Sequence, residues 1–209
     1  MRPEVAPGLA WVLVCALVGL PAACLGWAPL SEPAQWPPLW QSLVLRPDAG
    51  WHQAPWVLWT TAWLHGSERH LWLNLLGLLT LAFMGWRARL PGPWALRLSL
   101  AWPWTHLALL LDPRLTHYIG ASGFLHAGLV LWLAATWGSL GARGKWVWGL
   151  ALAALVAKVA WEVAASWGGG PTLLRPGADV PLAVWAHVSG VTAGLLLAGI
   201  HGAQRHHSG

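Results

Sequence analysis

Long apolar stretches alternate along the whole chain with short connectors that carry proline, glycine and charge. A helix that crosses a lipid bilayer needs about 20 mostly apolar residues, and six stretches approach that length. The connectors contain strong helix breakers, among them the Pro91-Gly92-Pro93 turn and residues 168–171. The pattern therefore predicts an all-α, polytopic membrane protein with six transmembrane helices, at about residues 9–27, 70–86, 94–111, 120–137, 146–166 and 181–200.

The composition favours a surface that faces lipid. Of the 209 residues, 56% are hydrophobic and only 9% are charged, against about 25% charged in a typical soluble domain. Tryptophan, which gathers at membrane interfaces, occurs 20 times. The sequence has no internal repeat and no soluble second domain, so residues 1–209 are interpreted as a single membrane domain. The net charge of +5 comes from scattered residues without an aromatic-basic stripe, which argues against nucleic acid as a partner.

The positions of the charged residues predict the orientation of these helices, because Lys and Arg gather on the cytoplasmic side. With the amino terminus inside, seven basic residues fall inside and four outside, and most acidic residues fall outside. Both termini are therefore predicted to be cytoplasmic, and a long first loop, at about residues 28–67, faces outward. The inside residues are Arg2, Arg87, Arg89, Arg97, Arg143, Lys145 and Arg205, and the outside residues are Arg46, Arg69, Arg114 and Arg175.

Ser122 is the first candidate for chemistry, because a polar residue inside a predicted span is energetically costly and needs a reason. It begins the fourth predicted helix within the tetrad Gly120-Ala121-Ser122-Gly123. One interpretation is a helix N-cap. The other is a nucleophile, since its small neighbours let a peptide approach the hydroxyl and the N–H groups at a helix start suit a developing oxyanion.

His187 is the second candidate, about six residues inside the sixth predicted helix. It lies beside small residues that recur every four positions, so they share one helix face and permit another helix to approach closely. If that helix carries Ser122, the imidazole meets the hydroxyl, which is the pairing that activates a serine. The alternative is a hydrogen-bonded structural histidine. The small residues are Ala186, Gly190, Gly194 and Ala198.

Two further polar pairs have i, i+4 spacing, so each pair shares one helix face. His70 and Asn74 fit either an anionic oxygen or ordinary interhelical hydrogen bonds. Lys158 and Glu162 are expected to neutralise each other as a structural pair, with a proton relay as the alternative. The sequence has no His-Glu-x-x-His signature, so neither a metal nor another cofactor is predicted.

Taken in order along the chain, three motifs resemble the core of the rhomboid intramembrane serine proteases. They are residues 65–74, residues 120–123 and residues 186–194. The likeness extends over essentially the whole chain, from the first helix to the sixth. It implies a six-helix rhomboid-like bundle in which Ser122 is the nucleophile and His187 is its base.

The same resemblance assigns roles to the neighbouring residues. It implies that His70 and Asn74 help to bind the oxyanion, with Gly123 beside the nucleophile. It also implies that Gly190 and Gly194 form the close-packing motif of the last helix. No acid is evident to orient the base, so the expected catalytic unit is a Ser-His dyad rather than a triad.

The chain departs from the usual rhomboid pattern at two places. Trp56 falls on the Trp of the outer-loop Trp-Arg motif, but Val57 stands where the Arg is expected, so the support of that loop should differ. His126 stands where many rhomboids have a Tyr against the catalytic His. Residues 122–126 resemble the rhombosortase branch, which is associated with Gram-negative secretion and is thought to trim proteins with a glycine-rich, hydrophobic, basic-ended carboxyl-terminal tail.

The resemblance implies an endopeptidase of the bacterial inner membrane that cuts membrane-anchored proteins bearing a carboxyl-terminal transmembrane tail. At 1.5 Å per residue, the base would lie roughly 9 Å below the outer surface, so the cut should fall near the outer interface. The main alternative is a non-catalytic rhomboid-like binder of transmembrane segments. A transporter or channel is a further alternative, although only Lys158 and Glu162 lie deep in a span.

Overall fold

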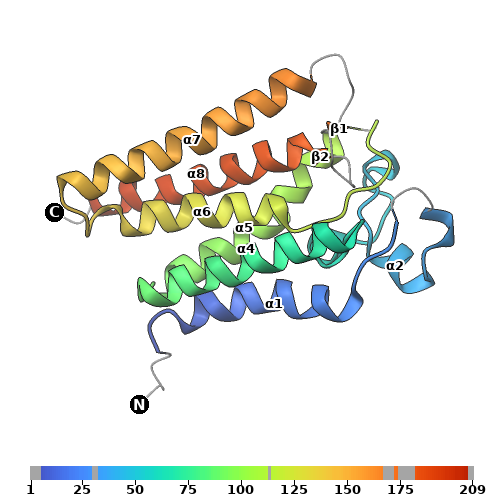
Figure 1. Cartoon of the computed structure of the whole chain (residues 1–209), viewed down its shortest axis with the longest axis horizontal. Coiled ribbons are helices and arrows are strands. Elements are labelled where there is room, and N and C mark those ends of the chain that lie inside the picture. Colours follow the sequence, from blue (N-terminus) through green and yellow to red (C-terminus); the bar gives the residue numbers. More distant parts are fainter. Residues whose placement is uncertain (1–5, 30–32, 113, 167–171, 174–181, 207–209) are drawn as a thin grey trace.

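The chain folds almost entirely as α-helix. The computed structural model describes residues 6–29, 33–112, 114–166, 172–173 and 182–206. Six long helices form the body of the molecule and coincide closely with the six predicted stretches (Figure 1). The prediction of an all-α chain with six long helices is therefore confirmed. These helices are α1 (Leu9–Leu25), α4 (Glu68–Arg87), α5 (Gly92–Leu107), α6 (Ser122–Trp137), α7 (Ala142–Ser166) and α8 (Val184–His206).

Local sequence explains where several helices begin and end. The Ser67 hydroxyl caps α4 by accepting a hydrogen bond of 3.0 Å from the backbone N–H of His70. Helix α5 follows Pro91 and has a second proline in its first turn, where a missing N–H has no helical partner to lose. The 3-10 turn η4 (Ala108–Leu111) then continues α5 to the end of the third predicted stretch. Arg2, Arg175 and the predicted break at residues 168–171 lie outside the described residues.

The six helices lie side by side and alternate in direction (Figure 1). The most extensive helix contact is between α6 and α8, and α5 packs against both of them. Helix α1 packs mainly against α4, on the far side of the bundle from α7 (Figure 1). The start of α1 and the end of α8 lie at the same end of the bundle, as six consecutive antiparallel helices require.

Small residues permit the close approach of α6 and α8. A Cβ atom on Gly194 would lie 2.8 Å from the Cβ of Val130 and 2.9 Å from the carbonyl oxygen of Ala127. A Cβ atom on Gly190 would collide with the carbonyl oxygen of Gly123. Any larger side chain at these glycines would push the helices apart, so the predicted close-packing role of the last helix is confirmed.

The segment between α1 and α4 gathers at the end of the bundle where α6 begins (Figure 1). It is tied to the residues before α6 by two backbone hydrogen bonds: the N–H of Tyr118 donates to Leu45 at 2.9 Å, and that of Gly120 donates to Thr61 at 3.1 Å. The antiparallel pair β1 (Thr172–Leu173) and β2 (Leu182–Ala183) precedes α8 at this end. The short helices of the segment are η1 (Pro33–Gln35), α2 (Pro38–Leu43), η2 (Pro47–Ala49), α3 (Val57–Thr60) and η3 (Thr61–Trp63).

Large apolar side chains remain exposed on the outward faces of the bundle, for example Trp72 and Phe83 on α4 and Trp146 on α7. Among the described residues, α7 is the one helix long and apolar enough to cross a membrane, with a mean hydropathy of 1.6 over a stretch that is 11% buried. Helices α1 and α6 and residues Val184–Gly199 are apolar but shorter. By length and composition, and with little of its surface buried, α7 could therefore cross a membrane.

Candidate active site

Ser122 is the first residue of α6, at the end of the bundle that the α1–α4 segment covers. Two positions before it, Gly120 has a φ of +117°, a conformation that residues with a Cβ rarely adopt. The turn is held by the hydrogen bond from Gly120 to Thr61 and by the Tyr118 hydroxyl, which donates to the Gly120 carbonyl at 3.1 Å. The nucleophile candidate therefore stands at a braced helix start, where backbone N–H groups point outward.

The glycine contact between α6 and α8 brings two histidines together. A Cβ atom on Gly123 would lie 2.8 Å from the carbonyl oxygen of Ala186, so the first turn of α6 rests on the turn of α8 that carries His187. One turn further along α6, His126 stacks on His187 with ring centroids 4.0 Å apart and an angle of 19° between the rings. The resemblance places His126 where many rhomboids have a Tyr against the catalytic His, and in this chain His126 lies against His187.

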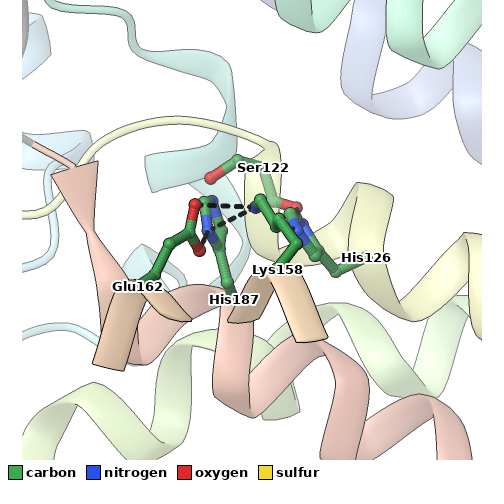
Figure 2. A network of polar contacts seen from close by, with 5 residues as sticks. All are labelled: Ser122, His126, Lys158, Glu162 and His187. Atoms are coloured by element: carbon green, nitrogen blue, oxygen red, sulfur yellow. Dashed lines mark hydrogen bonds and ion pairs between the residues drawn. The ribbon is translucent and has the colours of Figure 1, made fainter. Parts of the chain in front are cut away.

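A charged pair on α7 completes the cluster around His187 (Figure 2). Lys158 and Glu162 form the expected ion pair, with 3.0 Å between Nζ and Oε1. Glu162 is fully buried, and its Oε2 lies 2.7 Å from Nδ1 of His187. The Lys158 Nζ lies 2.8 Å from Nε2 of His126 and 3.0 Å from Nδ1 of His187. The pair is thus confirmed, and it is also joined to both histidines.

No acid beside His187 was evident from the sequence, but the structure places Glu162 against it. Glu162 lies 25 positions earlier in the sequence and on a different helix. The i, i+4 spacing shows that Lys158 and Glu162 share one face of α7, but it does not show which neighbour that face meets. In the folded chain the face turns inward, toward the contact between α6 and α8 (Figure 2).

The hydrogen-bond partners determine which ring nitrogens carry protons. The backbone carbonyl of Ser122 can only accept, so Nδ1 of His126, 2.7 Å away, carries a hydrogen, and its Nε2 accepts from the Lys158 ammonium. The Glu162 carboxylate likewise accepts from Nδ1 of His187. A neutral His187 then has its lone pair on Nε2, which is the tautomer that a general base for serine requires.

Tyr118 lies beside the start of α6 in this conformation. Burial raises the pKa of Tyr118 to about 12, and the nearby Ser122 side chain and Gly123 backbone oppose that rise. Figure 2 shows the hydroxyl directed to the side where His187 and Glu162 lie, with no interaction drawn to the ring. No hydrogen bond joins Ser122 to His187 among the residues that the structure describes. The two residues lie on contacting turns as predicted, but the hydroxyl is not engaged with the imidazole.

His70 lies against the turn that precedes Ser122. A Cβ atom on Gly120 would be 2.7 Å from Cε1 and 2.8 Å from Nε2 of the His70 ring, so the imidazole touches the glycine. The ring also lies 4.9 Å from that of His65, and burial together with the nearby His70 lowers the pKa of His65 to about 3. His70 thus lies beside the turn that precedes Ser122.

Asn74, the partner predicted for His70, lies one turn deeper in α4 and is buried. Its side-chain amide donates to the backbone carbonyl of His70 at 2.9 Å. That donor is therefore used within its own helix. The pair shares one face as the spacing predicts, and of the two, His70 makes the contact with the turn before Ser122.

The segment near Trp56 is supported by apolar packing. The Trp56 indole N–H donates to the Ser42 carbonyl at 3.0 Å. Val57, which stands where the resemblance places an Arg, is buried in a cluster with Leu45, Leu109 and other apolar residues. Apolar packing and the Trp56 hydrogen bond therefore hold this part of the segment.

A groove of about 680 Å³ opens between α5 and α8, on a face of α8 different from the one that carries His187. Its lining is mostly apolar, with Ser189 and Thr192 as polar positions. Asp112 and Arg114 lie in the lining and form an exposed ion pair at 2.8 Å. The groove lies beside the turn of α8 that carries the candidate base.

Sequence reasoning missed three residues of this site. It did not select Tyr118, and it did not pair Lys158 or Glu162 with the histidines. Tyr118 is the single tyrosine of the chain, and that rarity was the feature by which the sequence could have indicated it. An acid deep in an apolar stretch was the signal for Glu162. Among the described residues, no group of three or more His, Cys, Asp or Glu side chains is placed to hold a metal ion.

The chemistry available to this cluster is proton transfer between a hydroxyl, an imidazole and a carboxylate, beside a helix start that can stabilise negative charge. No protein-family model matches the chain, and no curated protein or solved structure matches it either.

Proposed function

We propose that the chain is a serine-type intramembrane endopeptidase of the rhomboid type, with Ser122 as nucleophile and His187 as general base. The observation that carries the proposal is the contact between Gly123 and Ala186, which brings the neighbouring Ser122 and His187 onto facing turns of α6 and α8. The hydrogen bond from His187 Nδ1 to Glu162 supports the base role, because it leaves the lone pair on Nε2.

We further propose that all six long helices cross the bilayer of the bacterial inner membrane. The exposed apolar side chains along α1, α4, α5, α7 and α8 support this placement, since such a surface is unfavourable in water. The charge pattern favours cytoplasmic termini. The opposite end, where Ser122 begins α6, then faces the outer aqueous phase and can receive water.

The reaction begins when the Ser122 hydroxyl forms a hydrogen bond with Nε2 of His187. Hydrogen bonds of a catalytic site often tighten only when substrate is bound. His187 Nε2 takes the hydroxyl proton while Oγ bonds to the peptide carbonyl carbon. The oxyanion that forms is stabilised by backbone N–H groups at the start of α6 and by the His70 imidazole.

The second half of the reaction returns the proton. His187 Nε2–H protonates the leaving amine as the C–N bond breaks, which leaves an ester on Ser122. A water molecule then attacks the ester carbon and gives a proton to Nε2. Nε2–H passes that proton to Oγ as the C–Oγ bond breaks, which releases the new acid and restores the serine. An amine in place of this water would transfer the acyl group instead of hydrolysing it.

The proposed substrates are proteins anchored by a carboxyl-terminal transmembrane tail, cut near the outer interface. The likeness of residues 122–126 to the rhombosortase branch favours a glycine-rich sorting tail. The exposed apolar surface around the site is compatible with a substrate that arrives through the bilayer rather than from water.

A membrane-anchored reporter tests the proposed reaction. The full chain in lipid vesicles should cut it, whereas Ser122→Ala and His187→Ala should not. His70→Ala should slow the cut by about 10²–10³-fold, the usual effect of losing an oxyanion donor. His117→Ala, a change at an outlying histidine of the loop before α6, is the matched control and should leave the rate unchanged. Full cleavage by either Ser122→Ala or His187→Ala would refute the catalytic pair.

A second candidate function is the capture of transmembrane segments without cleavage. The observation that favours it is that, within the part of the chain that the structure describes, no hydrogen bond joins the Ser122 hydroxyl to His187 (Figure 2). The apolar groove between α5 and α8 would serve as the binding surface. Such a binder would hold the reporter in the membrane and leave both its length and Ser122 unchanged.

A further inference from the structure

Helix α7 buries a carboxylate although it buries little else. Val159 and Glu162 are its buried residues within the described part of the chain. The Glu162 side chain is 0% exposed, whereas that of Lys158 is 37% exposed. Burying a carboxylate is strongly unfavourable unless it is paired and hydrogen-bonded. An ion pair that only neutralised charge could have stayed at the surface with its lysine, so the buried position of Glu162 calls for a further role.

The buried carboxylate divides its two oxygens between two partners. Oε1 lies 3.0 Å from the Lys158 ammonium, and Oε2 lies 2.7 Å from Nδ1 of His187. Lys158 in turn donates to Nε2 of His126, whose Nδ1–H donates to the Ser122 carbonyl. One continuous set of hydrogen bonds therefore joins the acid on α7 to the base on α8 and to the first turn of α6.

We propose that Glu162 is the positioning residue of His187, so that the working unit is Ser122, His187 and Glu162, with the acid supplied by a third helix. This inference rests on the proposed protease function. Glu162 holds the ring orientation and the tautomer, and it stabilises the imidazolium that forms when His187 accepts the serine proton.

Lys158 has a separate part in this arrangement. His187 gives its Nδ1–H to Glu162, so Lys158 cannot donate to the same nitrogen and acts there as a nearby positive charge. It balances the buried carboxylate in the resting enzyme and braces His126 against the ring of His187. Removing Lys158 alone should therefore be less harmful to the chemical step than removing the Glu162 carboxylate.

A simpler role for Glu162 is to neutralise the charge of Lys158. Variants that remove one charge or both charges distinguish this role from the positioning of His187. Glu162→Gln removes the carboxylate and leaves the lysine charge beside His187. The double variant Lys158→Met with Glu162→Gln removes both charges and keeps similar side-chain volumes. If Glu162 only neutralises Lys158, the double variant regains activity; if Glu162 positions His187, it stays slow.

The experiment measures kcat and KM for the membrane-anchored reporter with the full chain in lipid vesicles. Glu162→Gln should lower kcat by about 10²–10⁴-fold, because loss of the orienting acid affects the transition state, and KM should stay within about twofold. Glu162→Asp, which keeps the carboxylate, should recover part of kcat. Glu68→Gln, the same change on an exposed acid, is the matched control and should leave kcat unchanged.

The outcomes separate this inference from the proposed function. Wild-type kcat in the double variant, or in Glu162→Gln, would overturn the positioning role while leaving the protease intact. A change in KM alone would also overturn it, since that places Glu162 in substrate binding. If Glu162→Gln does not fold, the uncharged double variant decides the question. A wild-type chain that never cuts the reporter would overturn the proposed function, and the inference with it.

Discussion

The two contacts that α8 makes near His187, one with α6 and one with α7, are built from different kinds of residue. Against α6 the surface consists of glycines and backbone, with Gly123 on the carbonyl of Ala186 and Gly190 on the carbonyl of Gly123. Against α7 a few apolar residues, including Val159 and Val191, share the contact with a charged cluster.

This difference assigns separate tasks to the two neighbours of α8. Backbone-to-backbone packing leaves no room for adjustment, so the α6 contact sets the distance between the turns of Ser122 and His187. Hydrogen bonds depend on orientation, so the α7 contact sets the ring position and tautomer of His187. The first contact should therefore be sensitive to side-chain volume, and the second to charge.

The largest effect is expected when volume is added to the α6 contact. Gly190→Val should lower the free energy of unfolding by more than about 3 kcal/mol, because its side chain would meet backbone atoms that cannot move aside. Gly149→Val on α7, where a Cβ would meet nothing within 4 Å, should change it by less than about 0.5 kcal/mol. Thermal unfolding in detergent micelles measures both variants, and equal stabilities would contradict the division of tasks.

A charge change in the α7 contact should have a smaller effect on stability. Glu162→Gln should lower the free energy of unfolding by about 1–3 kcal/mol, because it weakens hydrogen bonds between charged groups. The double variant with Lys158→Met should recover most of this loss, since no charge is then left without its partner. Chemical unfolding of the two variants gives the comparison, and a double variant less stable than the single one would contradict this account.

The smallest effect is expected at Tyr118, whose hydroxyl donates to the Gly120 carbonyl in the turn before Ser122. Tyr118→Phe removes this one hydrogen bond and should leave the rate at which Ser122 reacts with a fluorophosphonate within about twofold, because the hydrogen bond from Gly120 to Thr61 also holds the turn. Removing the hydrogen bond from Tyr118 to Gly120 should lower stability slightly. A fall in the reaction rate would instead show that Tyr118 assists the nucleophile.

The sequence predicts the six helices well because each apolar stretch and each breaker acts locally. The glycine contact was also predictable, since Gly190 and Gly194 reveal their shared helix face through their spacing. Ser122 and His187 were found in the same way, from small neighbours within an apolar stretch.

The orienting acid and the tyrosine were not predictable by this reasoning. Whether Glu162 meets His187 depends on how α7 is rotated against α8, and that rotation follows from contacts between distant parts of the chain. The position of Tyr118 beside the start of α6 depends on the turn at Gly120, which the α1–α4 segment holds through Thr61. Local patterns reveal faces and helix ends, whereas pairings across helices require the packed structure.

The most direct test of the pairing between Ser122 and His187 is the site of covalent labelling. The full chain in lipid vesicles is treated with a fluorophosphonate, and the modified residue is identified by mass spectrometry. Modification of Ser122 in the wild-type chain, and its loss in His187→Ala but not in His117→Ala, is the predicted result. Labelling of Ser122 at the wild-type rate in His187→Ala, or no labelling of the wild-type chain, would contradict the account.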